Sequence, residues 1–529
     1  MREGTLDYPL TLPALAEFCA HRFGDKPAIR DGEISLDYGH LDDLRRQAAK
    51  AFLAAGIERG DRIAVWAPNS YRWIIAALAM QTIGAVLVPL PGRLTGAEAA
   101  DIIERSGSRL LLTAIDMPAG NPLAMLANYN LPGLQQCLLI DGDLQLANSW
   151  PSFLESAQSV SEPQLQARAA SVQPGDIMDM LFTSGTTGKP KGVLCSHEQN
   201  LRVFKTWANT VGLRSDDRYL IVSPFFHSFG YKAGWLAAFM TGSCIYPVAA
   251  FDRQAVMAQI ERDKISVFPG APALYEMLLN HPRRQGFDLS SLRLAVTGAA
   301  PITVSLIEAL KQTLGFDVVV TAYGLTEASG VVTMCQPEDS HQLIAETSGR
   351  AIAGVEVKCV DPATLRPLRA REEGEIWVRG FSVMRGYFDM PQASREAITR
   401  EGWLRTGDIG VLDDEGYLKI TGRLKDMYIM NGENVYPAEV ENVIAALPGV
   451  AQVAVLGVEQ QPQGEVGIAC VVLSLGSHLS SGDLQAHCRE NLAAYKVPAQ
   501  VVFMDNLPMN ATGKVMKPAL RQRLETSTA

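Results

Sequence analysis

The sequence has no excess of positive charge, which argues against a nucleic-acid partner. It contains 47 Lys and Arg residues against 57 Asp and Glu residues, so the net charge is -10. Proteins that bind polyanions do so largely through clustered Lys and Arg side chains. This sequence is acidic overall and has no block of basic residues. We therefore expect no nucleic acid among the partners.

Cysteine is sparse and follows no metal-binding or disulfide pattern. The eight cysteines are scattered over 529 residues, with no CxxC pair and no Cys/His cluster at zinc spacing. Scattered reduced thiols are typical of the cytosol, so we expect a cytoplasmic protein.

A long unbroken apolar run is also missing. The most membrane-like stretch, Trp73–Leu90, contains the polar pair Gln81 and Thr82, whereas about 20 apolar residues are needed to span a bilayer. A buried helix over 74–80 followed by a short strand over 85–88 explains this stretch better. The first ten residues lack the basic-then-apolar layout of a secretory signal. We expect neither a transmembrane segment nor export.

Apolar residues make up 47% of the chain, and its length exceeds the ~250–300 residues at which single cores stop growing. At least two domains are therefore expected. Strand-like runs alternate with helical patterns from about residue 12 to 344, which indicates parallel sheets covered by helices. The expected strands there are Arg62–Trp66, Arg109–Leu112, Tyr219–Val222, Ser266–Pro269, Leu292–Thr297 and Val318–Thr321.

The pattern changes twice towards the C-terminus. Short strands separated by turns, at Val355–Val360, Gly374–Arg379 and Gly416–Thr421, predict a β-rich barrel or sheet between residues 350 and 422. After Gly422–Asp426 the pattern resets to a compact α+β unit of a size that can fold alone, with one of its helices expected at Ser481–Asn491. We predict an α/β fold in which a large domain over 1–424, with two helix-covered sheets and a β-barrel-like subdomain, precedes a small α+β domain over 425–529.

The sharpest local motif is the loop Thr-Ser-Gly-Thr-Thr-Gly-Lys-Pro-Lys at 183–191, which follows the apolar run 177–182. Its glycines let the backbone approach an anion, and its hydroxyls and lysines can bind a polyphosphate. The spacing excludes a Walker A loop, which needs four residues between its glycines and Ser or Thr after its lysine. A flexible linker has no need of this mix after a core strand. The loop therefore predicts triphosphate binding.

This loop and five further blocks resemble, in order, the motifs of the adenylate-forming superfamily, which includes acyl-CoA synthetases, luciferases and peptide-synthetase adenylation domains. The further blocks are Thr297–Pro301, Tyr323–Glu327, Arg405–Asp408, Gly422–Asp426 and Asn510–Lys514. The resemblance covers nearly the whole chain and implies a large domain hinged to a small one. It also implies ATP, Mg²⁺ and coenzyme A as the molecules that the enzyme uses.

The resemblance assigns a nucleotide site. Tyr323 would stack on adenine, Asp408 and Arg423 would bind the ribose, and Thr326 would donate to a phosphate oxygen. Glu327 would hold Mg²⁺, which takes a few carboxylate oxygens together with substrate phosphates. The other expected contacts are Thr183, Ser184, Gly185, Thr186, Thr187, Gly188, Lys189, Pro190 and Lys191 in the loop, Gly298, Ala299 and Ala300 beside adenine, and Gly324 after the tyrosine.

Lys514 is the expected catalytic lysine. Attack of a carboxylate on the α-phosphate brings two anions together, and a positioned ammonium stabilises the charge that develops. Because a thiol must then displace AMP, the small domain is expected to swing about Lys425, the hinge position. Gly432 would then border a narrow thiol tunnel or be a plain turn glycine. Lys517, which no motif includes, is interpreted as an exposed lysine.

The segment Ser223–Gly234 would line the acid pocket. His227 would orient the carboxylate, gate the pocket, or be a buried histidine with satisfied hydrogen bonds. The small residues 328–331 opposite would leave room for a bulky acid. Lys232 would pair with a polar group on that acid or extend to the surface.

The pocket segment, together with 320–323 and 425–429, is similar to bacterial ligases that activate HIP, a bicyclic propanoate from steroid rings. The leading hypothesis is thus an AMP-forming acid–CoA ligase for such an acid. The alternatives are a medium- or long-chain fatty acid, an enzyme that loads a carrier protein, and a nucleotide sensor, against which the intact Lys514, Glu327 and Thr326 argue. The chain ends without a carrier domain, which favours free CoA; no pattern specifies an oligomeric state.

Overall fold

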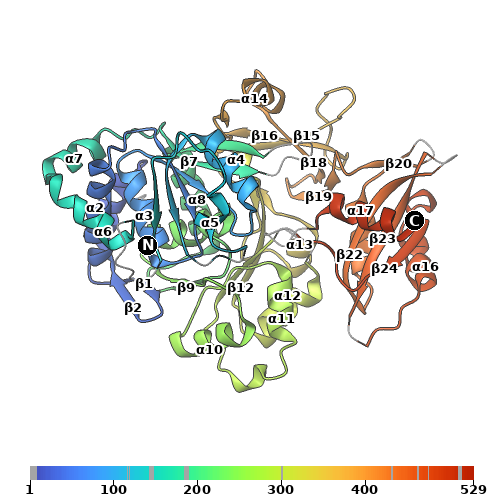
Figure 1. Cartoon of the computed structure of the whole chain (residues 1–529). Helices are drawn as coiled ribbons and strands as arrows, with labels where there is room; N and C mark the ends of the chain where they lie inside the picture. The colour runs from blue at the N-terminus through green and yellow to red at the C-terminus, as the bar shows by residue number, and fades with distance from the viewer. Residues whose placement is uncertain are drawn as a thin grey trace.

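The computed structural model describes residues 9–115, 117, 119–141, 148–183, 190–298, 302–430, 433–460, 464–474, 476–509 and 515–528, the side chains of 434, 464 and 525–528 excepted. Figure 1 shows a large body that carries the N-terminus and a smaller one, at the right, that carries the C-terminus. Strands and helices alternate in the large body, as the sequence predicted.

The first large sheet has seven strands in the order β17-β8-β7-β4-β3-β5-β6. The strands are β3 (Arg62–Trp66), β4 (Val86–Pro89), β5 (Ser108–Thr113), β6 (Gln136–Leu139), β7 (Ile177–Thr183), β8 (Lys191–Ser196) and β17 (Gly386–Tyr387). Neighbours from β6 to β7 run parallel, whereas β8 is antiparallel to β7, and β17 to β8. Because β7 and β8 pair at Thr183 and Lys191, the two ends of the phosphate loop are held together where β7 ends and β8 begins.

The second large sheet is made of two four-stranded parts. They are β2 (Ile34–Asp37), β1 (Pro27–Asp31), β10 (Cys244–Pro247) and β9 (Arg218–Ile221), then β11 (Leu294–Thr297), β12 (Val318–Tyr323), β13 (Thr333–Met334) and β14 (Arg350–Ala351). Single bridges from Tyr219 to Val267 and from Val267 to Leu294 join the parts. The run predicted as a strand at Ser266–Pro269 makes this join: Val267 bridges both neighbours, and the Phe268 amide donates to the Leu294 carbonyl at 3.0 Å. It is less regular than predicted, because Gly270 and Pro272 follow at once and turn the chain into a helix.

The β-rich part that follows is an antiparallel sheet, β15 (Val355–Val360), β16 (Gly374–Gly380), β18 (Leu404–Leu412) and β19 (Leu418–Arg423). The small body has β21 (Glu433–Val435), β20 (Tyr428–Met430), β23 (Gly464–Leu473) and β22 (Val450–Gln460), with β24 (Gln500–Phe503) paired to β23. Its helices are α15 (Pro437–Ala445), α16 (Ser481–Asn491) and α17 (Lys517–Thr528). One apolar cluster runs from Leu12 to Leu418, and separate clusters fill the small body.

Helices cover the sheets of the large body, and polar residues fix their ends. Ser196 and Gln199 form a capping box at the start of α8, and Gly212 ends that helix with φ 68°. The helices are α1 (Leu12–Phe23), α2 (Tyr38–Ala54), α3 (Tyr71–Thr82), α4 (Gly96–Ser106), α5 (Pro122–Leu126), α6 (Trp150–Glu155), α7 (Glu162–Ala170), α8 (His197–Val211), α9 (Ala237–Thr241), α10 (Arg253–Asp263), α11 (Pro272–Leu279), α12 (Val304–Thr313), α13 (His341–Glu346) and α14 (Pro391–Ala397).

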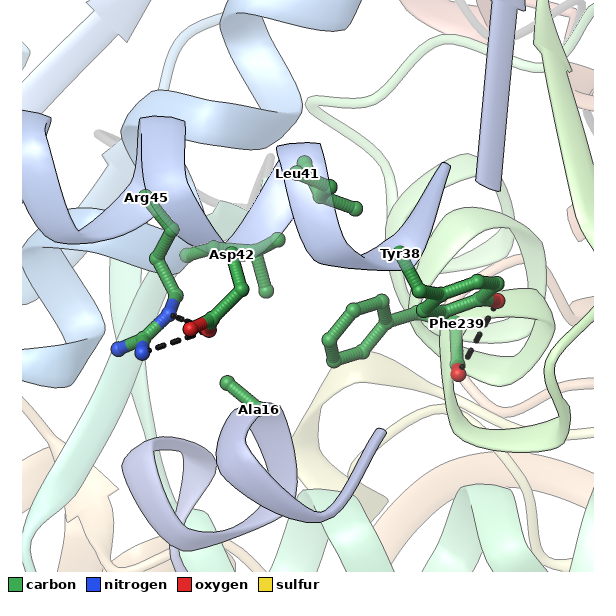
Figure 2. Close-up of a pocket in the computed structure, with 7 residues that line it drawn as sticks. Ala16, Tyr38, Leu41, Asp42, Arg45 and Phe239 are labelled. Carbon is green, nitrogen blue, oxygen red and sulfur yellow. Dashed lines mark hydrogen bonds and ion pairs between the residues drawn. The ribbon is translucent and has the colours of Figure 1, made fainter. Parts of the chain in front are cut away.

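Figure 2 shows a small space between α1, α2 and α9, in which Arg45 pairs with Asp42 and the Tyr38 hydroxyl donates to the carbonyl of Phe239. None of its lining residues is a predicted site residue. Within the described ranges, no helix is long and apolar enough to cross a membrane. All eight cysteines are free thiols, and all but Cys137 are buried.

Candidate active site

The carboxyl ends of strands from both large sheets meet at Glu327. Thr183 ends β7 of the first sheet, and Glu327 lies in the short 3-10 helix η4 (Thr326–Ala328) that follows β12 of the second. The Thr183 hydroxyl donates to Glu327 Oε1 at 3.2 Å. Open α/β sheets bind ligands at the carboxyl ends of their strands, so this contact marks the centre of the candidate site.

Tyr387 is the second donor to the same carboxylate. Its hydroxyl lies 3.1 Å from Glu327 Oε1, and the Met384 amide donates to the Glu327 carbonyl at 2.8 Å. The ammonium of Lys191 lies 4.8 Å from the centre of the Tyr387 ring. Burial and the nearby Glu327 carboxylate raise the pKa of Tyr387, so its hydroxyl stays protonated and donates. The β17 segment thus joins η4 to the base of the phosphate loop.

The expected adenosine residues also lie together. Asp408 and Arg423 stand opposite each other on β18 and β19. The Asp408 carboxylate accepts from the Tyr323 hydroxyl at 2.7 Å and from Arg423 Nε at 2.9 Å. Gly298 lies close to the backbone before Tyr323: a Cβ there would sit 3.2 Å from the Ala322 carbonyl oxygen. The predicted slot therefore has a fixed tyrosine on one side.

His227 lies at the start of the predicted acid segment. Its ring Nδ1 accepts from the Phe229 amide at 3.2 Å, and its carbonyl accepts from the Tyr231 amide at 2.9 Å. The residue is partly exposed, so of the three alternatives that of a buried histidine is wrong. Asn69, which sequence reasoning missed, fixes the start of the segment: it donates to the Ser223 carbonyl and accepts from the Phe225 amide.

The acid segment continues as a π-helix, η2 (Phe229–Leu236), with a kink at Gly234. Such π-turns are frequent at functional sites. At Gly230 any Cβ would lie 2.3 Å from the carbonyl oxygens of Ser223 and Pro224, so only glycine allows the segment to fold back on itself. Tyr231 and Trp235 of this segment pack with Trp73 of α3 in a buried aromatic cluster.

Two expectations about this pocket need correction. Ala328, Ser329 and Val331 are almost fully buried, and of the four small residues only Gly330 keeps accessible surface. Lys232 does not reach the surface, and its ammonium is already paired: it is 0% exposed and lies 3.0 Å from Asp179. The sequence could not show this, because the two residues lie on different elements far apart in the chain.

Lys425, the expected hinge, is exposed in the turn between β19 and β20. The interpretation of Lys517 as a plain exposed lysine is wrong. Its ammonium lies 3.1 Å from Glu441 and 3.5 Å from Asp426, and about a quarter of the side chain is exposed. It thereby ties the start of α17 to the residue after Lys425.

Several predicted contacts lie outside the described residues: Ser184, Gly185, Thr186, Thr187, Gly188, Lys189, Ala299, Ala300, Gly432 and Lys514. Pro190, Gly324 and Thr326 are described and stand at the edges of these segments or of η4. The described part of the site thus brings together Thr183, Lys191 and Glu327 in one group, and Tyr323, Asp408 and Arg423 in another.

Sequence models place the chain in a known family. The model described as "AMP-binding enzyme" matches residues 16–388, and that described as "AMP-binding enzyme C-terminal domain" matches 439–514. The first match covers most of the chain, so the protein belongs to the AMP-binding enzyme family. This confirms the predicted adenylate-forming class and an enzyme that ligates an acid to a thiol.

Individual relatives span the full length. The chain is 45% identical over 522 residues to a 7a-methyl-1,5-dioxo-octahydro-1H-inden-4-yl propanoyl:CoA ligase of Rhodococcus jostii, covering 98% of this chain and 99% of the relative. An anthranilate CoA ligase, AuaEII, in complex with anthranoyl-AMP has a TM-score of 0.87 at 26% identity, with 98% and 99% covered. A Mycobacterium tuberculosis fatty acyl CoA synthetase has a TM-score of 0.75 at 31% identity, with 98% and 99% covered. These likenesses confirm the α/β fold with a separate small C-terminal domain, and ATP and CoA are the expected cosubstrates.

Proposed function

We propose that the protein joins a bulky bicyclic propanoic acid of the HIP type to coenzyme A through an acyl-adenylate. The observation that carries the proposal is the 45% identity, over nearly all of both chains, to a ligase named for such an acid. The acid segment Ser223–Gly234 combines several aromatic side chains with the polar His227, and ligand sites are lined mostly by apolar side chains with a few polar groups.

In the first half-reaction the acid's carboxylate attacks the α-phosphate of ATP, forming acyl-AMP and releasing pyrophosphate. Lys514 is proposed to stabilise the negative charge that develops there. Tyr323 would stack on adenine, and Asp408 with Arg423 would hold the ribose. The polar ring of His227, partly exposed at the start of the acid segment, would orient the carboxylate.

The chemistry around Glu327 fits a magnesium ion that arrives with ATP. The hydroxyls of Thr183 and Tyr387 both donate to Glu327 Oε1. Among the described residues, no group of three or more His, Cys, Asp or Glu side chains could hold a metal. Magnesium often takes only one or two carboxylates and completes its shell with substrate phosphates and water. Bound there, it would neutralise phosphate charge.

In the second half-reaction the CoA thiol displaces AMP. We propose domains over 1–424 and 425–529 that change their arrangement about Lys425, with Gly432 bordering the thiol path. The separate apolar clusters of the two bodies support independent units. The free, mostly buried thiols support a place in the reducing cytosol.

The test is pyrophosphate release and acyl-CoA formation across a panel of acids. We expect the bicyclic propanoate to give a higher kcat/KM than decanoate, palmitate or ferulate, with free CoA as acceptor. A Lys514→Ala variant should lose pyrophosphate release but still convert supplied acyl-AMP to acyl-CoA. The likeness to a fatty acyl CoA synthetase favours a linear fatty acid as the alternative substrate. If decanoate or palmitate gave the higher kcat/KM, that alternative would hold and the bicyclic acid would be wrong.

A further inference from the structure

A buried ion pair joins the acid segment to the strand that leads to the phosphate loop. Lys232 lies in the middle of η2, and Asp179 lies on β7, four residues before Thr183. Lys232 Nζ is 3.0 Å from Asp179 Oδ1, and both side chains are 0% exposed. Because Lys232 is enclosed against Asp179, its predicted contact with the acid does not form. No other expected contact with ATP, acid or CoA involves either side chain.

Further buried polar groups fix the pair in place. Asn200 of α8 donates to the other Asp179 oxygen at 2.6 Å. Gln81 of α3 donates to the hydroxyl of Tyr231, the residue before Lys232, at 2.7 Å. All of these side chains are inaccessible to solvent, so the pair has one arrangement only. Four elements, β7, α3, α8 and η2, are thereby held to one another beneath the site.

Stability alone does not explain the pair. Removing two charges from water costs about as much as their attraction returns, and packed apolar residues of similar volume often stabilise a core equally well. Burial lowers the pKa of Lys232, but the nearby Asp179 and Cys195 raise it by more, so the ammonium stays charged at neutral pH. An ion pair is directional, so a charged lysine in this place fixes one position of η2 along β7. Apolar side chains of similar volume would fix that position less strictly.

We propose that Lys232 and Asp179 are a positioning pair, which holds the acid segment at a fixed place relative to the phosphate-loop strand so that the acid's carboxylate meets the α-phosphate. This inference rests on the proposed function of the same site. Neither residue touches the reacting atoms. They act through His227 and Phe229 at one end and through Thr183 at the other, since backbone connects each pair member to those residues.

The kinetic test compares Lys232→Met, Asp179→Asn and the double variant with the wild type, using the panel acid that the wild type turns over best. Displacing one substrate by about 1 Å can cost about 100-fold in rate. We expect kcat/KM for the acid to fall about 10- to 100-fold in all three, with KM for ATP unchanged. The double variant should regain thermal stability, because no unpaired charge remains, but not activity.

The matched control is the pair Arg293–Asp217, also largely buried, with Nη2 and Oδ2 2.5 Å apart. It lies at the amino ends of β9 and β11, opposite the site. Arg293→Met/Asp217→Asn should change stability without changing kcat/KM for the acid. If the Lys232→Met/Asp179→Asn double variant regained activity together with stability, the pair would be structural only and the proposal would be overturned.

Hydrogen exchange gives a readout that needs no acid and so separates this inference from the proposed function. In the wild type, a nonhydrolysable ATP analogue should protect the amides of both β7 and η2. In the double variant the analogue should protect β7 alone. Equal protection of η2 in both proteins would contradict the coupling, even if the wild type activated none of the acids tested.

Discussion

Replacing Tyr387 with phenylalanine removes one hydroxyl from the centre of the site and leaves the ring. In the structure that hydroxyl donates to Glu327 Oε1 at 3.1 Å, while the ring lies under the ammonium of Lys191. The Thr183 hydroxyl remains on the same carboxylate oxygen. The variant therefore loosens Glu327 without unpairing it and keeps the contact at the base of the phosphate loop.

The size of the effect follows from the bond that is lost. A hydrogen bond to a charged group contributes about 1.5–3 kcal/mol. Glu327 is partly exposed and keeps a second donor, so the lower end applies, about 1.5 kcal/mol or roughly tenfold in a binding constant. Because Glu327 is the proposed magnesium ligand, we expect the free Mg²⁺ concentration at half-maximal pyrophosphate release to rise about tenfold.

The assay varies free Mg²⁺ at saturating ATP and acid, and calorimetry of MgATP binding provides a measurement independent of turnover. Tyr417→Phe is the matched control: it removes a similar bond, to Asp339 at 2.7 Å, from a tyrosine that contacts none of the predicted site residues. An unchanged Mg²⁺ response in Tyr387→Phe, or an equal shift in Tyr417→Phe, would refute the reasoning.

Three further outcomes are expected. Burial lowers the pKa of His197 to about 4 from 6.5, so the unfolded chain takes up a proton at a higher pH than the folded one. The free energy of unfolding therefore falls by about 3 kcal/mol as pH drops from 6.5 to 4. Urea unfolding of His197→Gln should not show this loss. Gly324→Ala places a Cβ 2.1 Å from the Gly330 carbonyl oxygen, so unfolding should show a loss of about 1–3 kcal/mol and AMP should bind more weakly. Asp408→Asn weakens its bond from Arg423, and steady-state kinetics should show KM for ATP about 10- to 100-fold higher.

Several elements could be predicted because their signals are local. The strands at Arg62–Trp66 and Val355–Val360 and the helix at Ser481–Asn491 have the predicted bounds. Each combines an apolar period with a clear boundary, such as the Ser480 cap whose side chain accepts from the Asp483 amide. The order of the motifs also predicted the family, since a motif is a contiguous run of residues.

The site was predicted only in part, because a motif names residues but not their neighbours. The blocks around Glu327, Asp408 and Arg423 were found, and the structure brings the latter two together through the pairing of β18 and β19. Tyr387 was missed: only the placement of β17 beside β8 brings its hydroxyl to Glu327. Asn69 was missed for the same reason, since it acts on a segment more than 150 positions later.

By itself the sequence determined the α/β alternation, the separate small C-terminal unit and the family, because those depend on local pattern and contiguous motifs. Only the tertiary structure decided which charges are paired and buried. The sequence predicted that Lys232 would pair with the acid or extend to the surface and that Lys517 would be exposed. Instead, Lys232 is enclosed against Asp179, and Lys517 bridges Asp426 and Glu441. The physical reason is that the solvation of a charged side chain depends on what folds over it, and that is set by sheet order and helix placement.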